Sequence, residues 1–359
     1  MHDHNQDRMD GYIMDDKKMK AQLFYGPGDV RFEETDIPGV GRGEALVKIR
    51  SALTCGSDLK TYRRGHPTMI VDGSVFGHEW AGDIIELGEG VEDFSIGDRV
   101  VAVNSVPCFK CYYCKLERYS MCENLVYNNG AYAEYIKIPS DILAVNTIKI
   151  PRHIDYSQAA LLEPLACAVH GIDESNITEG DMVAVNGAGP IGLFFTALAK
   201  LKGAIVISSD LSEERIKVAR ELGADLTVNA SEVDDQVSAV KDLTEGGRGV
   251  DVAIEATGFP KVWEMTILMA RKGGTVNLFG GCASGTSINI DTKLLHYSEL
   301  TIKGIYHHTP YYVKKAFKLI DKGLFDTKKF ITADMPLSRL VDALELMGKQ
   351  RGIKYNITT

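Results

Sequence analysis

Long hydrophobic runs are missing from this sequence of 359 residues, and no segment has enough consecutive apolar residues to cross a bilayer. An excess of positive charge is also missing, because 40 Lys and Arg residues are outnumbered by 49 Asp and Glu residues, for a net charge of −9. This balance argues against a nucleic-acid or membrane partner. Internal repeats and low-complexity segments are absent as well. The hydrophobic content of 45% predicts a globular protein with a substantial core.

A secretory signal is also missing. Residues 1–18 are polar, lack an apolar core and are predicted to form a flexible leader. Without export, we expect the protein in the reducing cytoplasm, where disulfides are rare. Clustered cysteines among the seven are therefore expected to serve metal binding or catalysis.

The pattern of the chain changes near residue 151. Before it, strand-like runs end in Gly, Ser and Asp and predict an irregular, barrel-like β domain. After it, strands and helices alternate, which predicts an α/β domain whose doubly wound parallel sheet is covered on both faces. At the junction, Ser157 is expected to cap a helix. We predict one domain from residues 19–162 together with 304–359, and a second from residues 163–303.

A glycine-rich turn joins a predicted strand to a predicted helix in the run VAVNGAGPIGL. Its first glycine permits a tight turn, its second lets the backbone approach a pyrophosphate, and its third lets the helix pack on the strand. The helix N-terminus offers N–H groups and a positive dipole to the phosphates. A glycine triplet alone is weak evidence, but the flanking strand and helix supply the required context. The sequence therefore predicts a Rossmann dinucleotide site at Gly187, Gly189, Pro190, Ile191 and Gly192.

The next predicted strand ends at an acidic residue, Asp210. A carboxylate at this position binds the ribose hydroxyls of the adenosine half and repels a 2′-phosphate. NAD is therefore predicted in preference to NADP. Arg215 lies close enough in the sequence to approach a phosphate, although a solvated helix face is an alternative role for it.

Four residues of zinc-ligand type are scattered along the first half of the chain. Cys55 ends a strand-like run, His78 and Glu79 are adjacent, and Glu163 lies at the domain junction. Singly, each has an ordinary structural explanation, such as a buried cysteine. Together they match a catalytic zinc site, which needs about three protein ligands and one open position.

Four further cysteines are concentrated in CFKCYYCKLERYSMC, with the spacing C-x2-C-x2-C-x7-C. Such gaps let four thiolates surround one ion and close a tetrahedral zinc site. An iron–sulfur cluster, disulfides and free thiols are the alternatives. The residues concerned are Cys108, Cys111, Cys114 and Cys122.

These motifs together resemble the zinc-dependent medium-chain dehydrogenases. The resemblance covers nearly the whole chain after residue 19 and rests on an ordered set of motifs: CGSD, GHEWAG, GEGVEDFSIGDRV, the four-cysteine loop, LLEPLAC and GAGPIGL. It implies a Rossmann domain beside a β-rich, GroES-like catalytic domain. The sorbitol and polyol dehydrogenase branch is most similar, because EPLA places Glu163 where many alcohol dehydrogenases have cysteine.

The resemblance also implies roles for individual residues. Cys55, His78 and Glu79 match ligands of a catalytic zinc, and Glu163 matches an acid that is either a ligand or one water away. The four-cysteine loop matches a structural zinc site, so two zinc ions per chain are expected. Relatives are commonly dimers or tetramers, and we expect a homo-oligomer.

Proton transfer is where this chain departs from the family pattern. Ser57 matches the inner end of a relay whose outer histidine is replaced here by Lys60. Lys60, a water or His66 is the candidate for the outer end. Strand-end residues are expected by resemblance to contact the nicotinamide half of the dinucleotide; they are Thr257, Gly258, Gly280, Gly304, Ile305 and Tyr306.

We therefore expect an enzyme that interconverts a secondary alcohol and its ketone by hydride transfer to NAD, with a polyol or sugar alcohol as substrate. An L-threonine 3-dehydrogenase or a butanediol or secondary-alcohol dehydrogenase is the alternative enzyme. A nucleotide-binding relative without activity is the alternative from another class.

Overall fold

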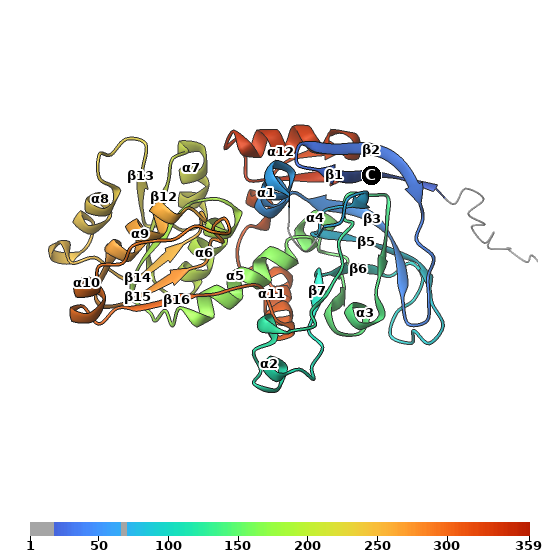
Figure 1. The fold of residues 1–359 in the computed structure, drawn as a ribbon, viewed down its shortest axis with the longest axis horizontal. Helices are drawn as coiled ribbons and strands as arrows, with labels where there is room; N and C mark the ends of the chain where they lie inside the picture. The colour runs from blue at the N-terminus through green and yellow to red at the C-terminus, as the bar shows by residue number, and fades with distance from the viewer. Residues whose placement is uncertain (1–17, 66–69) are drawn as a thin grey trace, which may run out of the picture.

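The computed structural model describes residues 18–65 and 70–359. Apart from Lys18, the predicted leader lies outside the described residues, and so does His66. Figure 1 shows two regions side by side along the long axis, a parallel sheet with its helices and a larger β-rich region. In the described part of the chain, no helix is both long enough and apolar enough to span a membrane.

The first region is the predicted Rossmann fold, a six-stranded parallel sheet in the order β13-β12-β11-β14-β15-β16. Its central strands are rich in buried Val, Ile and Ala, as expected for a sheet covered on both faces. The strands are β11 (Met182–Asn186), β12 (Ile205–Asp210), β13 (Leu226–Asn229), β14 (Val250–Glu255), β15 (Ala270–Leu278) and β16 (Thr301–Gly304). The helices are α5 (Leu162–Glu174), α6 (Pro190–Leu201), α7 (Glu213–Glu221), α8 (Gln236–Asp242), η2 (Glu245–Gly247), α9 (Pro260–Met269) and α10 (Thr292–Tyr297).

The β-rich region is built around a seven-stranded, mostly antiparallel sheet in the order β10-β6-β5-β3-β18-β17, with β9 also paired to β3. Its strands are β3 (Ala45–Leu53), β5 (Trp80–Leu87), β6 (Arg99–Ala102), β9 (Tyr135–Ile138), β10 (Thr147–Lys149), β17 (Ile331–Pro336) and β18 (Lys354–Thr358). Smaller sheets contain β1 (Lys18–Gly26), β2 (Asp29–Asp36), β4 (Ser74–Val75), β7 (Ser105–Val106) and β8 (Val126–Tyr127). Short helices complete the region: α1 (Gly56–Arg64), α2 (Tyr112–Lys115), η1 (Tyr119–Met121), α3 (Ser140–Asn146) and α4 (Tyr156–Ala159).

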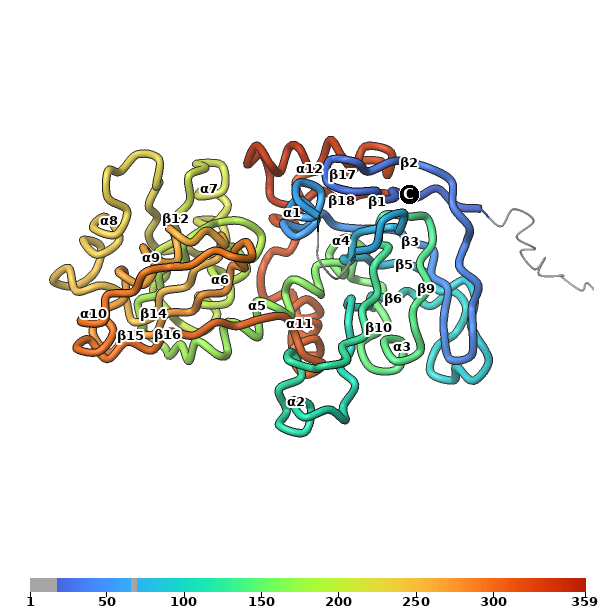
Figure 2. Tube along the Cα trace, viewed as in Figure 1, coloured from blue at the N-terminus to red at the C-terminus, as the bar shows by residue number. Residues whose placement is uncertain are grey.

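The C-terminal segment returns to the β-rich region. Strand β18 pairs antiparallel with β3, with Asn356 opposite Leu53. Helix α12 packs against α1, and α11 packs against α5 (Figure 2). This return brings residues from the two ends of the chain into one sheet. The remaining elements are α11 (Pro310–Asp321), η3 (Thr327–Phe330), η4 (Leu337–Arg339) and α12 (Leu340–Gly348).

The helix expected to start at Ser157 is two helices, and Ser157 is not its cap. Helix α4 begins after Asp155, whose carboxylate accepts from the first turn while the Gln158 side chain accepts the Asp155 N–H at 3.3 Å. This reciprocal capping box satisfies two backbone donors, which a serine inside the turn cannot do. Helix α5 begins after Leu161 and carries Glu163 in its first turn.

Candidate active site

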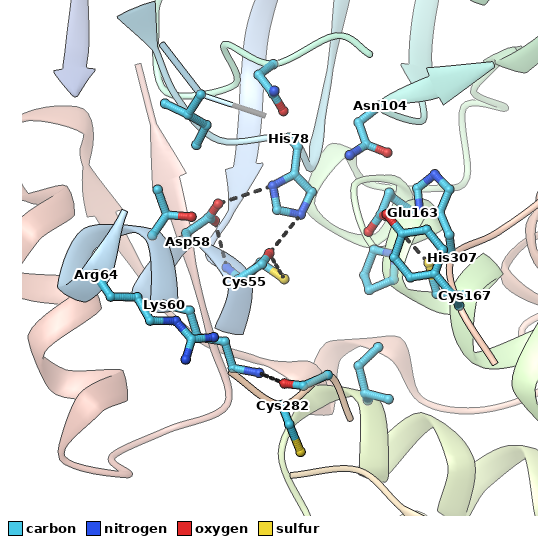
Figure 3. A pocket seen from close by; sticks show the side chains of 18 of the residues that line it. Cys55, Asp58, Lys60, Arg64, His78, Asn104, Glu163, Cys167, Cys282 and His307 are labelled. Carbon is cyan, nitrogen blue, oxygen red and sulfur yellow. Dashed lines mark hydrogen bonds and ion pairs between the residues drawn. The ribbon is translucent and has the colours of Figure 1, made fainter. Parts of the chain in front are cut away.

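A cavity of about 920 Å³ is lined by residues from both regions (Figure 3). Its wall combines the beginning of α1, the segment before β5, the first turn of α5 and the loops that follow β15 and β16. Eight of the predicted site residues line it: Cys55, Ser57, Lys60, His78, Glu163, Ile191, Ile305 and Tyr306.

Cys55 and His78 meet because their strands, β3 and β5, are neighbours in the sheet. Cys55 is the N-cap of α1, and His78 lies just before β5. The Ser57 hydroxyl lies 3.2 Å from the Cys55 Sγ and 3.5 Å from the His78 Nε2. Three groups able to bind a metal or move a proton therefore converge at the start of α1.

Asp58 fixes the orientation of both predicted ligands. Its Oδ1 lies 3.2 Å from the His78 Nδ1, and its Oδ2 accepts the Cys55 N–H at 3.0 Å. The buried Tyr132 hydroxyl also donates to Asp58. Burial opposes protonation of His78, but the Asp58 carboxylate outweighs it and raises the pKa of His78. Because Asp58 lies at the Nδ1, the Nε2 is the nitrogen left to bind zinc once it loses its proton, as in a zinc-ligating histidine.

Glu79 is placed differently from the other predicted ligands. Its ligand oxygen lies within 4.8 Å of those of Cys55 and His78, but both oxygens accept from the Lys354 Nζ, at 2.7 and 2.6 Å. Both side chains of this ion pair are completely buried. Burial disfavours the charge on Lys354, yet the Glu79 carboxylate outweighs it and raises the pKa of Lys354. Glu79 does not line the cavity.

Glu163 lies across the cavity with two histidines that follow β16. Potential ligand atoms of Glu163, His307 and His308 lie within 4.8 Å of one another. Its Oε1 accepts from the Cys167 thiol at 3.5 Å, one turn along α5. Glu163 does not belong to the Cys55 cluster, so the structure divides the predicted catalytic ligands between two sides of one cavity (Figure 3).

His307 lines this side of the cavity as a neutral polar group, and His308 is buried directly behind it. Burial lowers the pKa of His307 to about 3, and burial also lowers that of His308. His307 adopts a left-handed φ of 63°, uncommon outside glycine, and its Nε2 lies 2.6 Å from the Ser105 hydroxyl. The His308 Nδ1 is buried without a hydrogen-bond partner among the described residues. A neutral imidazole with a free nitrogen is suited to a hydroxyl-bearing ligand.

The four-cysteine loop forms a separate lobe around α2 and η1, away from the cavity. Its four Sγ atoms lie within 4.8 Å of one another, and those of Cys111 and Cys122 are 3.9 Å apart. Four sulfurs at the usual Zn–S distance would be about 3.8 Å apart. All four cysteines are free thiols. Backbone N–H groups, chiefly that of Lys110, lower the pKa of Cys108 to about 6. The donor set and its spacing fit a closed zinc site.

The glycine turn has the geometry that dinucleotide binding requires. Gly187 has φ 103°, and a Cβ on Gly192 would overlap the Gly187 carbonyl oxygen. Open space surrounds the position of a Cβ on Gly189, which is the N-cap of α6, with Pro190 in the first turn. The N-terminus of α6 can therefore be approached closely by a phosphate.

Asp210 and Arg215 lie at the end of β12 and in α7. The Asp210 carboxylate accepts N–H groups of Ala188 and Ser212 at 2.7 and 2.9 Å, which fixes it beside the glycine turn. The Arg215 guanidinium donates to the Gly352 carbonyl at 3.3 Å. The acid thus faces the turn, while the arginine is held by the C-terminal segment.

The remaining predicted cofactor residues lie at the carboxyl ends of β14, β15 and β16. Thr257 and Gly258 donate backbone N–H groups to the Glu255 Oε1 at 2.7 and 3.0 Å. A Cβ on Gly280 would lie within 2.6 Å of the Glu255 Oε2. Gly304 ends β16. These loops leave the sheet edge accessible to an extended ligand.

Sequence reasoning did not identify Asp58, Tyr132 or Lys354 as parts of the site. Asp58 had a signal, because a residue three positions after an N-cap turns back to it. Tyr132 and Lys354 had none, because only the sheet brings them to Cys55 and Glu79.

Comparisons with known proteins agree with this architecture. The model of the alcohol dehydrogenase GroES-like domain matches residues 41–151, and that of the zinc-binding dehydrogenases matches residues 190–322. The chain is 31% identical to sorbitol dehydrogenase of Bacillus subtilis, over 92% of this chain and 93% of that one. It is 38% identical to L-threonine 3-dehydrogenase of Pyrococcus furiosus, over 80% and 81%.

Among solved structures, one described as a zinc-binding dehydrogenase of Sinorhizobium meliloti 1021, bound to NADP, superposes with a TM-score of 0.88 at 29% identity. The alignment covers 96% of this chain and all of that one. The chain therefore belongs to the zinc-binding alcohol dehydrogenase family, near its polyol dehydrogenases.

Proposed function

We propose that this protein is a zinc- and NAD-dependent dehydrogenase that interconverts a secondary alcohol of the polyol class and its ketone. The observation that carries the proposal is the shared cavity: Cys55, His78 and Glu163 line it together with Ile191 and Ile305 from the dinucleotide side. An alcohol held on the side of Cys55, His78 and Glu163 thus lies where a nicotinamide can reach its carbinol carbon.

We assign the catalytic zinc to Cys55 and His78, with Glu163 on the opposite side of the cavity as the acid that ligates it directly or through a water. Glu79 is not assigned as a zinc ligand, because both of its carboxylate oxygens accept hydrogen bonds from the Lys354 Nζ. When bound, zinc supplies a Lewis acid for the substrate oxygen, and NAD supplies the hydride acceptor. The four-cysteine lobe would hold the second, structural zinc.

The protein's own groups orient the substrate and move its proton. Ser57 Oγ, beside Cys55 and His78, accepts the hydroxyl proton and passes it to solvent, to which Ser57 is exposed. Asp58 holds His78 in the required tautomer. His307 and Asn104 line the cavity as polar groups that can receive further hydroxyl groups of a polyol. The Asp210 carboxylate beside the glycine turn favours NAD over NADP as the cofactor, because it would repel a 2′-phosphate.

L-threonine oxidation is the second candidate, because the threonine dehydrogenase relatives have the higher identity over a shorter alignment. NADH formation on a panel of sorbitol, erythritol, 2,3-butanediol and L-threonine tests the choice. We expect turnover of the polyols. Turnover of threonine alone would exclude the polyol assignment, and no turnover of any alcohol would exclude the dehydrogenase assignment.

We also propose that the protein works in the cytoplasm as a homo-oligomer. Its seven cysteines are all free, which supports a reducing compartment. Light scattering coupled to size exclusion measures the oligomeric state, and a monomer would contradict this part of the proposal.

A further inference from the structure

Two cations on α1 face the same cavity as the catalytic ligands. Lys60 and Arg64 are four residues apart, so they lie on one side of the helix, and both line the cavity. Figure 3 shows the two side chains beside each other below Cys55. The Lys60 Nζ donates to the Gly281 carbonyl at 3.0 Å, in the loop after β15.

Neither cation has an anionic partner. Among residues 18–65 and 70–359, no carboxylate lies within ion-pair distance of Lys60 or Arg64. Lys60 is partly buried, and burial, followed by the Arg64 charge, lowers the pKa of Lys60. Arg64 is exposed and Lys60 is half-buried, so an anion placed between them would be attracted by both charges. Among the described residues, Lys60 has two N–H donors left beyond Gly281, and no hydrogen bond occupies the five donors of Arg64.

No nearby acid among the described residues forms an ion pair with Lys60 or Arg64. Asp58 holds His78 and the Cys55 N–H. Glu255 uses Oε1 for the Thr257 and Gly258 N–H groups, while its buried Oε2 has no hydrogen-bond partner among the described residues and its charge acts on Lys60 from a distance. Within the described part of the chain, a direct ionic partner for Lys60 and Arg64 would therefore come from a bound ligand.

We propose that Lys60 and Arg64 form an anion subsite of the active-site cavity, which binds a phosphate or carboxylate group of a ligand. The inference rests on the proposed function, because that function brings two possible carriers of the group into this cavity. One carrier is the dinucleotide, whose phosphates connect the glycine turn to the nicotinamide half that we expect near Gly280, next to the Gly281 carbonyl that Lys60 contacts. The other is an alcohol substrate with an acidic end.

The geometry allows either carrier. At about 1.5 Å per residue, the seven residues from Ser57 to Arg64 extend roughly 10 Å along α1. That length matches a short sugar chain whose reacting carbon is at Ser57. The Arg64 guanidinium suits a carboxylate or phosphate that binds through two oxygens, and the Lys60 ammonium adds a point charge.

The test compares Lys60→Gln and Arg64→Gln with Arg63→Gln as the matched control. Arg63 is the neighbouring arginine of α1, but it lies over Gly348 of α12 and not in the cavity. Equilibrium binding of NADH and of inorganic pyrophosphate is measured by calorimetry, together with KM for sorbitol and for L-threonine. Calorimetry does not depend on turnover, so an enzyme inactive on every alcohol would refute the proposed function and still test the subsite.

Loss of a charge-assisted bond predicts binding about tenfold weaker for the anionic ligand. Weaker NADH and pyrophosphate binding in the Lys60 and Arg64 variants, but not in the Arg63 variant, assigns the subsite to the dinucleotide. A higher KM for threonine alone, with sorbitol and NADH unchanged, assigns it to an acidic substrate. If both variants match Arg63→Gln for all four ligands, the proposal is wrong.

Discussion

The four-cysteine lobe and the active-site cavity both rely on cysteine, but they are built in opposite ways. The lobe takes all its sulfurs from residues 108–122, and local backbone N–H groups surround them. The cavity takes Cys55, His78 and Glu163 from three distant parts of the chain and places them on two sides of an open space.

The two arrangements suit different roles, a structural one for the lobe and a catalytic one for the cavity. Four sulfurs that surround one point leave no position for a substrate. The proposed ligands on the cavity wall would leave one, and Asp58 and the buried Glu79–Lys354 pair lie beside them. The lobe therefore depends on local sequence, whereas the cavity depends on the packing of the whole sheet.

The largest expected effect comes from Cys55→Ser. Loss of this ligand should reduce kcat by about 10³-fold or more, because several kcal/mol of charge stabilisation disappear. NADH binding should be largely retained, since the glycine turn is elsewhere. Steady-state kinetics and NADH fluorescence measure the two quantities. Normal turnover in this variant would refute metal catalysis at Cys55.

Lys354→Met tests the contribution of the buried Glu79–Lys354 ion pair to stability. It leaves the Glu79 carboxylate buried and unpaired, which should cost about 3–5 kcal/mol of stability. Chemical denaturation measures the loss. The control is Arg339→Ala, which breaks an exposed pair with Asp342 and should cost at most about 1 kcal/mol. Adding Glu79→Gln to Lys354→Met should recover part of the loss, and no recovery would mean that the two side chains are not coupled.

Cys111→Ser should affect the lobe and spare the chemical step. We expect a thermal midpoint lower by on the order of 5 °C, with kcat per folded molecule close to that of the parent protein. Differential scanning fluorimetry and active-site titration measure both. A drop in kcat as large as that of Cys55→Ser would place the chemistry in the lobe after all.

The smallest expected difference between the two sites is in the rate at which a chelator removes their metal ions. The parent protein should contain about two zinc ions per chain, and Cys55→Ser and Cys111→Ser about one each. A chelator should remove the ion of the open site first, together with activity, and the ion of the closed site later. Elemental analysis during dialysis measures the order; one zinc per chain in the parent would contradict the two-site assignment.

Much of the fold could be predicted because its signals are local. The glycine turn and the strand that ends at Asp210 both match the structure. The Ser157 cap was wrong because Asp155 and Gln158 form a better reciprocal cap two residues earlier.

The site was predictable as a set of ligand types but not as an arrangement. The sequence could not separate Glu79 from Glu163, since both are acids beside other ligand-type residues. The structure distinguishes them by their neighbours: Glu79 contacts Lys354, and Glu163 faces the cavity.

The sequence by itself determined the family and the glycine turn, and it predicted the two kinds of cysteine site, because spacing within a short loop fixes which groups can meet. Only the tertiary structure decided which acid faces the cavity, that Asp58 orients His78, and that no described carboxylate pairs with Lys60 or Arg64. Glu79 is turned from the cavity toward Lys354, which also contacts Thr54, 300 positions away in the sequence. The pairing of β18 with β3 brings these residues together.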